Sequence, residues 1–220
     1  MSATVRVGLV ADSHVGEYLD AMPEAVFEAL EGCDVILHAG DLSVPSVLDD
    51  LARIAPVVAV RGDHDRLDGL SLPRDAVIQV AGHRIGLSHG DRAYPIDLAT
   101  VVCHLALRRR SAWRAGLHGS LLRRVGTVDC LVYGHWHDPL VAIHHGTLMV
   151  CPGAVCPWGS LEGGAPPGTG WSGISDRAVS RVRKQQGLFQ MQPRVGILEV
   201  GSSGIRPVLI PIGPPTLPVV

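Results

Sequence analysis

Two short pairs of residues in this sequence have the types and spacing of metal ligands. Asp12 and His14 stand two apart in "ADSH", and His135 and His137 stand two apart in "GHWH". Side chains two apart in extended backbone project to the same side, so each pair can offer two ligands to one centre, or to two centres a few ångströms apart. Either pair alone is more often ordinary polar loop sequence. Mixed carboxylate and imidazole ligation suits manganese, iron, zinc or nickel better than calcium alone.

Three further polar motifs also follow short apolar runs. Asp41 follows "DVILHAG", Asp63 and His64 follow "VVAVRG", and His89 follows "RIGLS". In open α/β sheets, ligands bind at the carboxyl ends of the strands, so one pocket would gather all of these side chains. Gly40 and Asp41 alone would also fit the start of a helix. The candidates for the shared pocket are Asp12, His14, Asp41, Asp63, His64, His89, His135 and His137.

This set of three carboxylates and five imidazoles is large enough to hold two metal ions. Two ions about 3.5–4 Å apart form a clamp for in-line displacement at phosphorus. A carboxylate such as that of Asp41 can bridge both ions, and a hydroxide between them would be the nucleophile. The set therefore indicates a dinuclear centre that hydrolyses phosphate esters.

The elements that must position these residues alternate between strand and helix in the first half of the chain. Apolar runs predict the strands, and Pro23 near the start and Gly32 past the end frame the first helix. Such alternation predicts parallel strands with helices packed over them. We expect strands at 4–10, 34–40 and 56–62 and helices at 23–32 and 44–54.

The second half of the chain has a different pattern, with hairpins that turn at Gly82 and Gly146. Together the two halves predict two mixed sheets packed face to face with helices outside, an α/β (α+β) fold. The segment 157–193 is rich in Gly, Pro and Ser and predicts an extended loop that is functional or mobile. The remaining expected elements are hairpins at 76–90 and 140–153, a long helical region at 97–125, a strand within 128–137 and two strands within 194–212.

The composition favours a soluble globular protein in the cytoplasm. The chain has 220 residues, of which 46% are hydrophobic and 18% charged, and its formal net charge is -2. It shows no basic field for nucleic acid, no apolar run of the roughly 20 residues that span a bilayer, and no signal peptide. The five cysteines lack the spacing of a disulfide framework, so we expect mostly buried, reduced thiols.

The assembled motifs resemble those of the calcineurin-like metallophosphoesterase superfamily, and their order and the chain length resemble the YfcE-type phosphodiesterases. The segment "CPGAV" stands where that family usually has "NPGS", and the likeness covers residues 4–155 and the last strands. Five separated motifs agree with the family pattern, which makes the signal specific. They are Asp12-Ser13-His14, Gly40-Asp41, Gly62-Asp63-His64-Asp65, His89-Gly90 and Gly134-His135-Trp136-His137.

The resemblance implies a four-layer αββα sandwich, with residues 1–220 forming a single metallophosphoesterase domain. It implies two divalent ions, with manganese as the first choice and nickel, iron, zinc or magnesium as alternatives. His64 would protonate the leaving alkoxide or hold the phosphoryl oxygens, Asp65 would orient the loop or His64, and His38 would support the loop before Asp41. The implied ligands are Asp12, His14, Asp41 and His137 for one ion and Asp41, Asp63, His89 and His135 for the other.

Asp63 departs from the family pattern, which has Asn at this position. With it, three carboxylates and one bridging hydroxide offset the charge of two divalent ions, whereas Asn would leave one net positive charge. An anionic phosphate is then attracted less, the bound water is less acidified, and the amide N–H donors are lost. We therefore count Asp63 with His64 among the catalytic residues and expect weaker activity, a different metal preference, or both.

The stretch between His89 and His135 also departs, because it is longer than in compact members of the family. Its Tyr94, Arg108, Arg109, Arg110 and Arg114 would form either a wall that contacts the substrate phosphate or a solvated helix face, and we favour the solvated face. The sequence identifies no substrate-binding residue beyond these.

We expect a metal-dependent phosphoesterase, more specifically a phosphodiesterase, that acts on a small phosphate ester such as a nucleotide. The alternative is a non-catalytic scaffold or metal-binding interaction protein, since the retromer scaffold subunit has this fold. The presence of His64 favours the enzyme. Nucleic acid is not an expected partner without a basic track, nor is a membrane, and a homo-oligomer is suggested by the resemblance alone.

Overall fold

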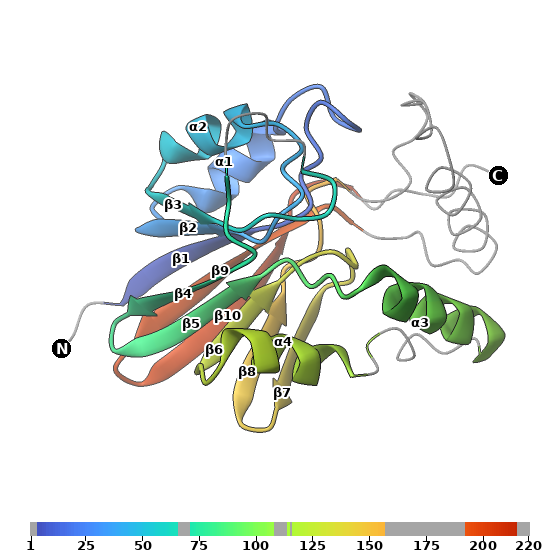
Figure 1. Ribbon diagram of the computed structural model, residues 1–220. Helices are drawn as coiled ribbons and strands as arrows, with labels where there is room; N and C mark the ends of the chain where they lie inside the picture. Colours follow the sequence, from blue (N-terminus) through green and yellow to red (C-terminus); the bar gives the residue numbers. More distant parts are fainter. Residues whose placement is uncertain (1–3, 66–70, 108–113, 115, 157–191, 215–220) are drawn as a thin grey trace.

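The computed structural model describes residues 4–65, 71–107, 114, 116–156 and 192–214. Two five-stranded sheets account for most of these residues (Figure 1). The first sheet has the strand order β10-β9-β1-β2-β3, in which β1, β2 and β3 are parallel and β9 and β10 run against their neighbours. Its strands are β1 (Val5–Val10), β2 (Val35–His38), β3 (Val57–Ala59), β9 (Arg194–Gly201) and β10 (Gly204–Pro211).

The second sheet has the order β4-β5-β6-β8-β7, and it is mixed as well. The pairs β5–β6 and β6–β8 are parallel, whereas the hairpins β4–β5 and β7–β8 are antiparallel. The expected turns at Gly82 and Gly146 are confirmed, and both glycines have positive φ (87° and 85°). The strands are β4 (Asp75–Val80), β5 (His83–Ser88), β6 (Cys130–Tyr133), β7 (Leu140–His144) and β8 (Thr147–Cys151).

The core lies between the two sheets, and helices cover the outer faces. Leu9 and Leu37 of the first sheet are buried in one cluster with Ile85 and Val132 of the second. The helices α1 (Glu24–Leu30) and α2 (Ser46–Ala52) pack on the outer face of the first sheet, and α4 (Leu117–Val125) packs on that of the second (Figure 1). The predicted sandwich of two mixed sheets between helices is therefore confirmed.

The long helical region expected at 97–125 is two helices among the described residues. The first, α3 (Tyr94–Leu107), begins earlier than expected and extends beyond the sheets (Figure 1). Gly116 adopts a left-handed conformation (φ 70°) directly before α4, which sets the start of that helix. The predicted loop at 157–193 lies outside the described residues except for its last residues, as do Arg108, Arg109 and Arg110.

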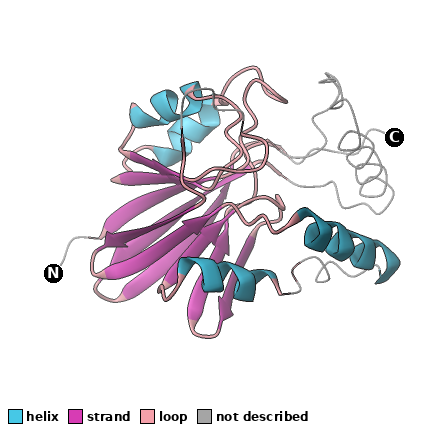
Figure 2. Ribbon diagram, viewed as in Figure 1, coloured by secondary structure: helices cyan, strands magenta, loops and turns pink. Residues whose placement is uncertain are grey.

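The topology places the carboxyl ends of several strands at one edge of the sandwich. Figure 2 shows the loops that follow these strands crowded at that end, while the hairpin turns lie at the opposite end. This edge is where the sequence places every candidate ligand. Among the described residues, no helix combines the length and the apolar character needed to cross a membrane. All five cysteines are free, and only Cys103 is exposed.

Truncating the inter-sheet core should destabilise the fold without touching the loop end. Leu37 is fully buried between the sheets, so Leu37→Ala is expected to lower the free energy of unfolding by about 2–5 kcal/mol. Ile143 on β7 is 69% exposed, so Ile143→Ala should change it by less than about 0.5 kcal/mol. Urea denaturation of both variants measures the difference. Equal effects would contradict this placement of the core.

Candidate metal centre

The predicted ligands emerge from the loops that follow β1, β2, β3, β5 and β6. Five of the seven adopt a positive φ, which non-glycine residues rarely do. Such strained backbone persists only where surrounding contacts enforce it, and it is concentrated at functional sites. The five are Asp12 (53°), His14 (47°), Asp41 (57°), His135 (73°) and His137 (52°).

The D-x-H pair serves one group of side chains and the H-x-H pair serves two, and neither pair has the expected backbone conformation. The sequence argument assumed extended backbone, but both members of each pair are left-handed. The chain therefore turns sharply at every second residue. Asp12 and His14 do face one centre, whereas His135 and His137 point into two different groups of side chains.

The first group consists of Asp12, His14 and His137, and all three are buried. The Nε2 atoms of His14 and His137 lie 3.4 Å apart, and His137 Nε2 lies 3.7 Å from Asp12 Oδ1. The backbone N–H of His135 donates to both oxygens of Asp12, at 3.0 and 3.1 Å, which fixes the orientation of that carboxylate.

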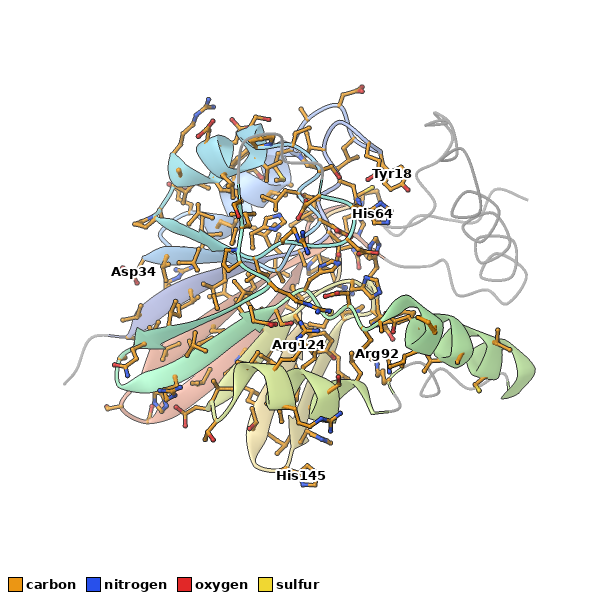
Figure 3. All side chains as sticks on the ribbon, in the orientation of Figure 1. Tyr18, Asp34, His64, Arg92, Arg124 and His145 are labelled. Atoms are coloured by element: carbon orange, nitrogen blue, oxygen red, sulfur yellow. The ribbon has the colours of Figure 1, made fainter. Side chains whose placement is uncertain are left out.

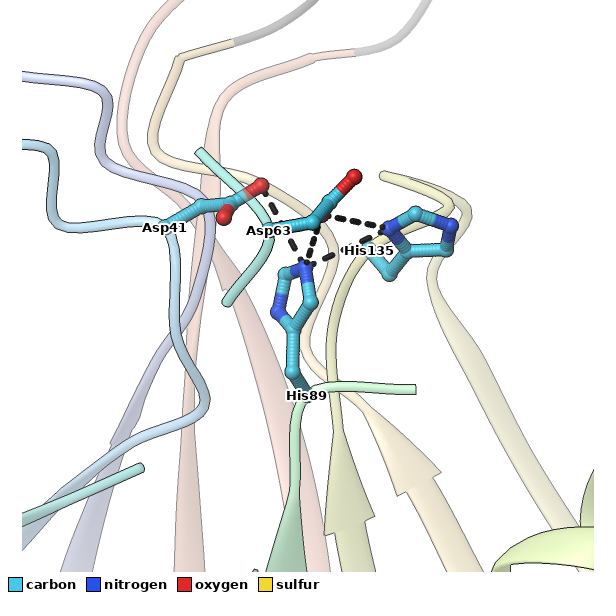
Figure 4. Close-up of side chains that lie close together, drawn as sticks. All are labelled: Asp41, Asp63, His89 and His135. Carbon is cyan, nitrogen blue, oxygen red and sulfur yellow. Dashed lines mark hydrogen bonds and ion pairs between the residues drawn. The ribbon is translucent and has the colours of Figure 1, made fainter. Parts of the chain in front are cut away.

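The second group consists of Asp41, Asp63, His89 and His135 (Figure 4). Asp63 Oδ1 lies 3.0 Å from His89 Nε2 and 3.2 Å from His135 Nδ1, and the two imidazole nitrogens lie 3.3 Å apart. Asp63 is the open side of this group, with 48% of its side chain exposed, whereas His89 is fully buried.

Asp41 lies between the two groups. Its Oδ2 is 3.3 Å from His89 Nε2 and 3.7 Å from His14 Nε2, so one oxygen faces a histidine of each group. Its Oδ1 accepts a hydrogen bond from the backbone N–H of His64 at 2.9 Å. The carboxylate is thus anchored by one oxygen and presents the other to both groups, as a bridging ligand would.

The protonation of His89 tests whether this set fits a metal ion. His89 Nδ1 donates to the backbone oxygen of Ala39 at 2.8 Å. In the neutral imidazole, Nε2 is therefore unprotonated and carries a lone pair. That lone pair faces the carboxylates of Asp41 and Asp63. Three acceptors can converge only around a cation, which is either a proton or a metal ion.

The shifts in pKa also indicate that this group of side chains needs positive charge. Although burial disfavours its charged form, Asp41 and Asp63 raise the pKa of His89 well above its usual value. Burial raises the pKa of Asp12 to about 7, while hydrogen bonds from His135 and His89 overcome burial and hold the pKa of Asp63 well below its usual range. In the described part of the chain, neither Asp12, Asp41 nor Asp63 forms an ion pair with arginine or lysine. Carboxylates compensated only by imidazoles suit a divalent cation.

Buried backbone contacts hold the loops of this centre in place. A Cβ on Gly62 would lie 2.0 Å from Asp41 Oδ1, so the motif "GDHD" requires glycine at its first position. Asp65 accepts hydrogen bonds from the N–H groups of Gly62 (2.7 Å), Ser43 (2.8 Å) and Asp41 (3.2 Å). The expected structural role of Asp65 in orienting its loop is confirmed.

His38 supports the loop before Asp41, as expected. It is fully buried, its Nε2 lies 2.9 Å from Ser13 Oγ, and its Nδ1 accepts from the N–H of Gly40 at 3.3 Å. Burial lowers its pKa to about 3, so the ring is neutral. Its neutral ring joins the loops after β1 and β2 without adding charge.

His64 lies at the open side of the centre, near Tyr18 (Figure 3). Its ring stands edge-on to that of His14, with centroids 5.1 Å apart, and it is partly exposed. Although burial opposes it, hydrogen bonding to Glu17 raises the pKa of His64 to about 9. A quarter of the His64 side chain is exposed.

Sequence reasoning missed two carboxylates of this centre. Glu17 bonds the Nδ1 atoms of both His14 and His64, and Asp97 of α3 lies 3.6 Å from His135 Nε2. An acidic residue three positions after His14 was a visible signal for Glu17. No local pattern marks Asp97, because only the fold brings α3 to the loop after β6.

Of the four arginines for which either a substrate wall or a solvated helix face was considered, only Arg114 is described. That residue forms an ion pair with Asp138. Arg108, Arg109 and Arg110 lie outside the described residues, as does the side chain of Tyr94. The choice between a substrate wall and a solvated face therefore stays a prediction.

Comparisons with known proteins agree with this geometry. A family model described as the calcineurin-like phosphoesterase superfamily domain matches residues 5–166. A probable metallophosphoesterase of Methanothermobacter thermautotrophicus is 31% identical over 67% of this chain and 76% of its own length. A probable metallophosphoesterase of Methanocaldococcus jannaschii is 32% identical over 70% of each chain.

Solved structures share the fold at lower identity. Vacuolar Protein Sorting 29 of Cryptosporidium parvum has a TM-score of 0.59 at 18% identity, over 94% of this chain and 97% of its own. A predicted phosphoesterase of Streptococcus pneumoniae has a TM-score of 0.57 at 16% identity, over 98% and 95%. A zinc complex of Vps29 of Entamoeba histolytica has a TM-score of 0.56 at 20% identity, over 95% and 100%. The match of the family model and the two sequence relatives show that this chain belongs to the calcineurin-like phosphoesterase superfamily.

Proposed function

We propose that this protein is a metal-dependent phosphodiesterase with a dinuclear centre. The observation that carries the proposal is Asp41, whose Oδ2 faces a histidine of each ligand group. Asp12, His14 and His137 would hold one ion together with this oxygen, and Asp63, His89 and His135 would hold the other. Two divalent ions held there would supply a hydroxide nucleophile and neutralise charge at phosphorus.

The residues of the chain itself would bind, orient and protonate the substrate. His64 is the candidate proton donor to the leaving alkoxide, because its Nδ1 is held by Glu17 at 3.0 Å and its ring is partly exposed. Its backbone N–H bonds Asp41, so the donor is attached to the carboxylate between the two groups. This attachment keeps the proton close to the bond that breaks.

The charge of the site favours a phosphodiester over a phosphomonoester. Asp63 makes the loaded centre neutral, and the described ion pairs of Asp12, Asp41, Asp63 and Glu17 involve histidines alone. A diester carries one negative charge at neutral pH, whereas a monoester carries close to two and needs more positive charge from the site. A small diester, such as one built on a nucleotide, is the proposed substrate class, and manganese the proposed metal.

The similar solved structures named Vps29 support one alternative function, that of a non-catalytic interaction protein with the same fold. A scaffold does not need a partly exposed histidine held beside the metal ligands, as His64 is here. The enzyme is therefore the better-supported proposal, and turnover measurements separate the two.

Metal titration should reveal two sites that share Asp41. We expect the chelator-stripped protein to bind two manganese ions per chain in calorimetry. Asp41→Ala should weaken both sites, His137→Ala only one, and His89→Ala only the other. Each affected site should lose more than about 100-fold in affinity, since removing a group that merely supports a ligand already costs about 10–100-fold. Exposed Asp20, replaced by Ala, is the control; an unchanged affinity at either site in Asp41→Ala would contradict the bridge.

Hydrolysis of bis-p-nitrophenyl phosphate tests the activity itself. The stripped protein should be inactive and regain turnover with manganese, nickel, zinc or magnesium in a ranked order. With a nucleotide diester that releases an alkoxide, His64→Ala should lower kcat by about 10²–10⁴-fold, the range for loss of a general acid, and leave metal binding intact. The loss should be smaller with the p-nitrophenyl ester, whose leaving group needs little protonation. A folded protein that binds two ions and turns over no ester with any metal would establish the rival scaffold.

Replacing Asp63 tests the effect of charge at the centre. Asp63→Asn restores one net positive charge to the loaded centre and adds N–H donors, so turnover with the same metal should rise. Metal affinity should fall at the second group, because an amide binds a cation less tightly than a carboxylate does. Turnover is therefore compared at saturating metal. A clear drop in kcat for Asp63→Asn would refute the argument from charge.

A further inference from the structure

Glu17 contacts residues of three loops of the centre, and no sequence motif predicts these contacts. Its Oε2 lies 3.1 Å from His14 Nδ1 and 3.1 Å from Ser43 Oγ, and its Oε1 lies 3.0 Å from His64 Nδ1. These three partners come from the separate loops after β1, β2 and β3. The side chain is 29% exposed, so the carboxylate is held inside the site rather than in solvent.

The contacts fix the tautomer of both histidines. An ionised carboxylate can only accept, so Nδ1 must carry the proton in His14 and in His64. In His14 this leaves Nε2 as the lone pair, and Nε2 faces Asp41 Oδ2 at 3.7 Å and His137 Nε2 at 3.4 Å. In His64 it leaves Nε2 for the substrate.

We propose that Glu17 is a positioning residue that orients the metal ligand His14 and the proton-transfer residue His64 at the same time. This inference rests on the proposed function, which assigns those two roles. One carboxylate then links the first metal site to the general acid. Ser43, the third donor, restrains the carboxylate so that neither histidine can rotate without losing its partner.

A third metal ion is the competing interpretation of the same residues. His14, Glu17 and His64 offer ligand atoms within 4.8 Å of one another. A cation there would have to displace the Nδ1 proton of His14 while Nε2 serves the first group, which would leave a doubly coordinated imidazolate. The distances of 3.0–3.2 Å from Glu17 are those of ordinary hydrogen bonds. Hydrogen bonding therefore accounts for the arrangement without a further ion.

The first test uses full-length protein loaded with zinc, which permits NMR of the imidazole nitrogens. In wild type, His14 should coordinate through Nε2, and both His14 and His64 should show slowly exchanging Nδ1 protons. In Glu17→Gln and Glu17→Ala, the Nδ1 protons should exchange faster. Glu28→Ala, an exposed change on α1, should leave both signals unchanged. Coordination of His14 through Nδ1, or unchanged exchange in the variants, would overturn the proposal.

Calorimetry and kinetics supply the second test. Glu17→Ala should weaken zinc binding at one of two sites by about 10–100-fold, as removal of a group that orients a ligand does. At saturating metal its kcat should fall by a similar factor with KM unchanged. In a His64→Ala background, the same change should have no further effect on kcat. Three ions in wild type and two in Glu17→Ala would establish the third metal site and overturn the proposal.

The outcomes separate this inference from the proposed function. NMR and calorimetric effects of Glu17→Ala in a protein without turnover would support the positioning role and refute the phosphodiesterase. Normal turnover with unchanged Nδ1 exchange and kcat in Glu17→Ala would refute the positioning role and leave the phosphodiesterase standing. A kcat loss that persists in the His64→Ala background would also overturn the link to His64.

Discussion

The convergence of carboxylates whose described partners include histidines but no arginine or lysine is the constraint on which the rest of the centre depends. Asp12 and Asp41 are almost fully buried, and their described ion pairs are with histidines alone. Burying such charges is costly unless a cation compensates them. The site can therefore be stable with ionised carboxylates only when protons on the imidazoles, or metal ions among them, supply positive charge. Metal ions bound among the imidazoles would supply this charge without requiring the rings to be protonated.

A second cost comes from the backbone. Left-handed residues outside glycine cost about 1–3 kcal/mol each, and five predicted ligands adopt that conformation. The inter-sheet core fixes where each strand ends, and Asp65 joins three backbone N–H groups of two loops. The strained backbone is therefore confined to the loops at one edge of the sandwich, and the core and the Asp65 hydrogen bonds offset its cost. This division explains why the ligands lie in loops although the strands determine their positions.

The sequence predicted the fold and the main ligand groups because each ligand follows an apolar run that reads as a strand. Its account of local geometry was less successful. Positive φ at Asp12 and His14 cannot be seen in residue types that usually avoid it. Glu17 and Asp97 were missed because their partners are distant in sequence, 47 positions in the case of Glu17 and His64. Hydrogen-bond partners of this kind are brought together by the fold, and no periodic pattern in the sequence marks them.

Asp63 and Glu17 would act on the charge of the proposed centre in different ways. Asp63 lies among the proposed ligands, so it would lower the net charge that a bound phosphate meets. Glu17 lies behind the histidines, so its negative charge stabilises a protonated His64 without entering the coordination shell. A centre with less attraction for phosphate gains more from a proton donor that is already charged and oriented. In the proposed reaction, the reduced charge at Asp63 would therefore increase the dependence on the Glu17–His64 pair.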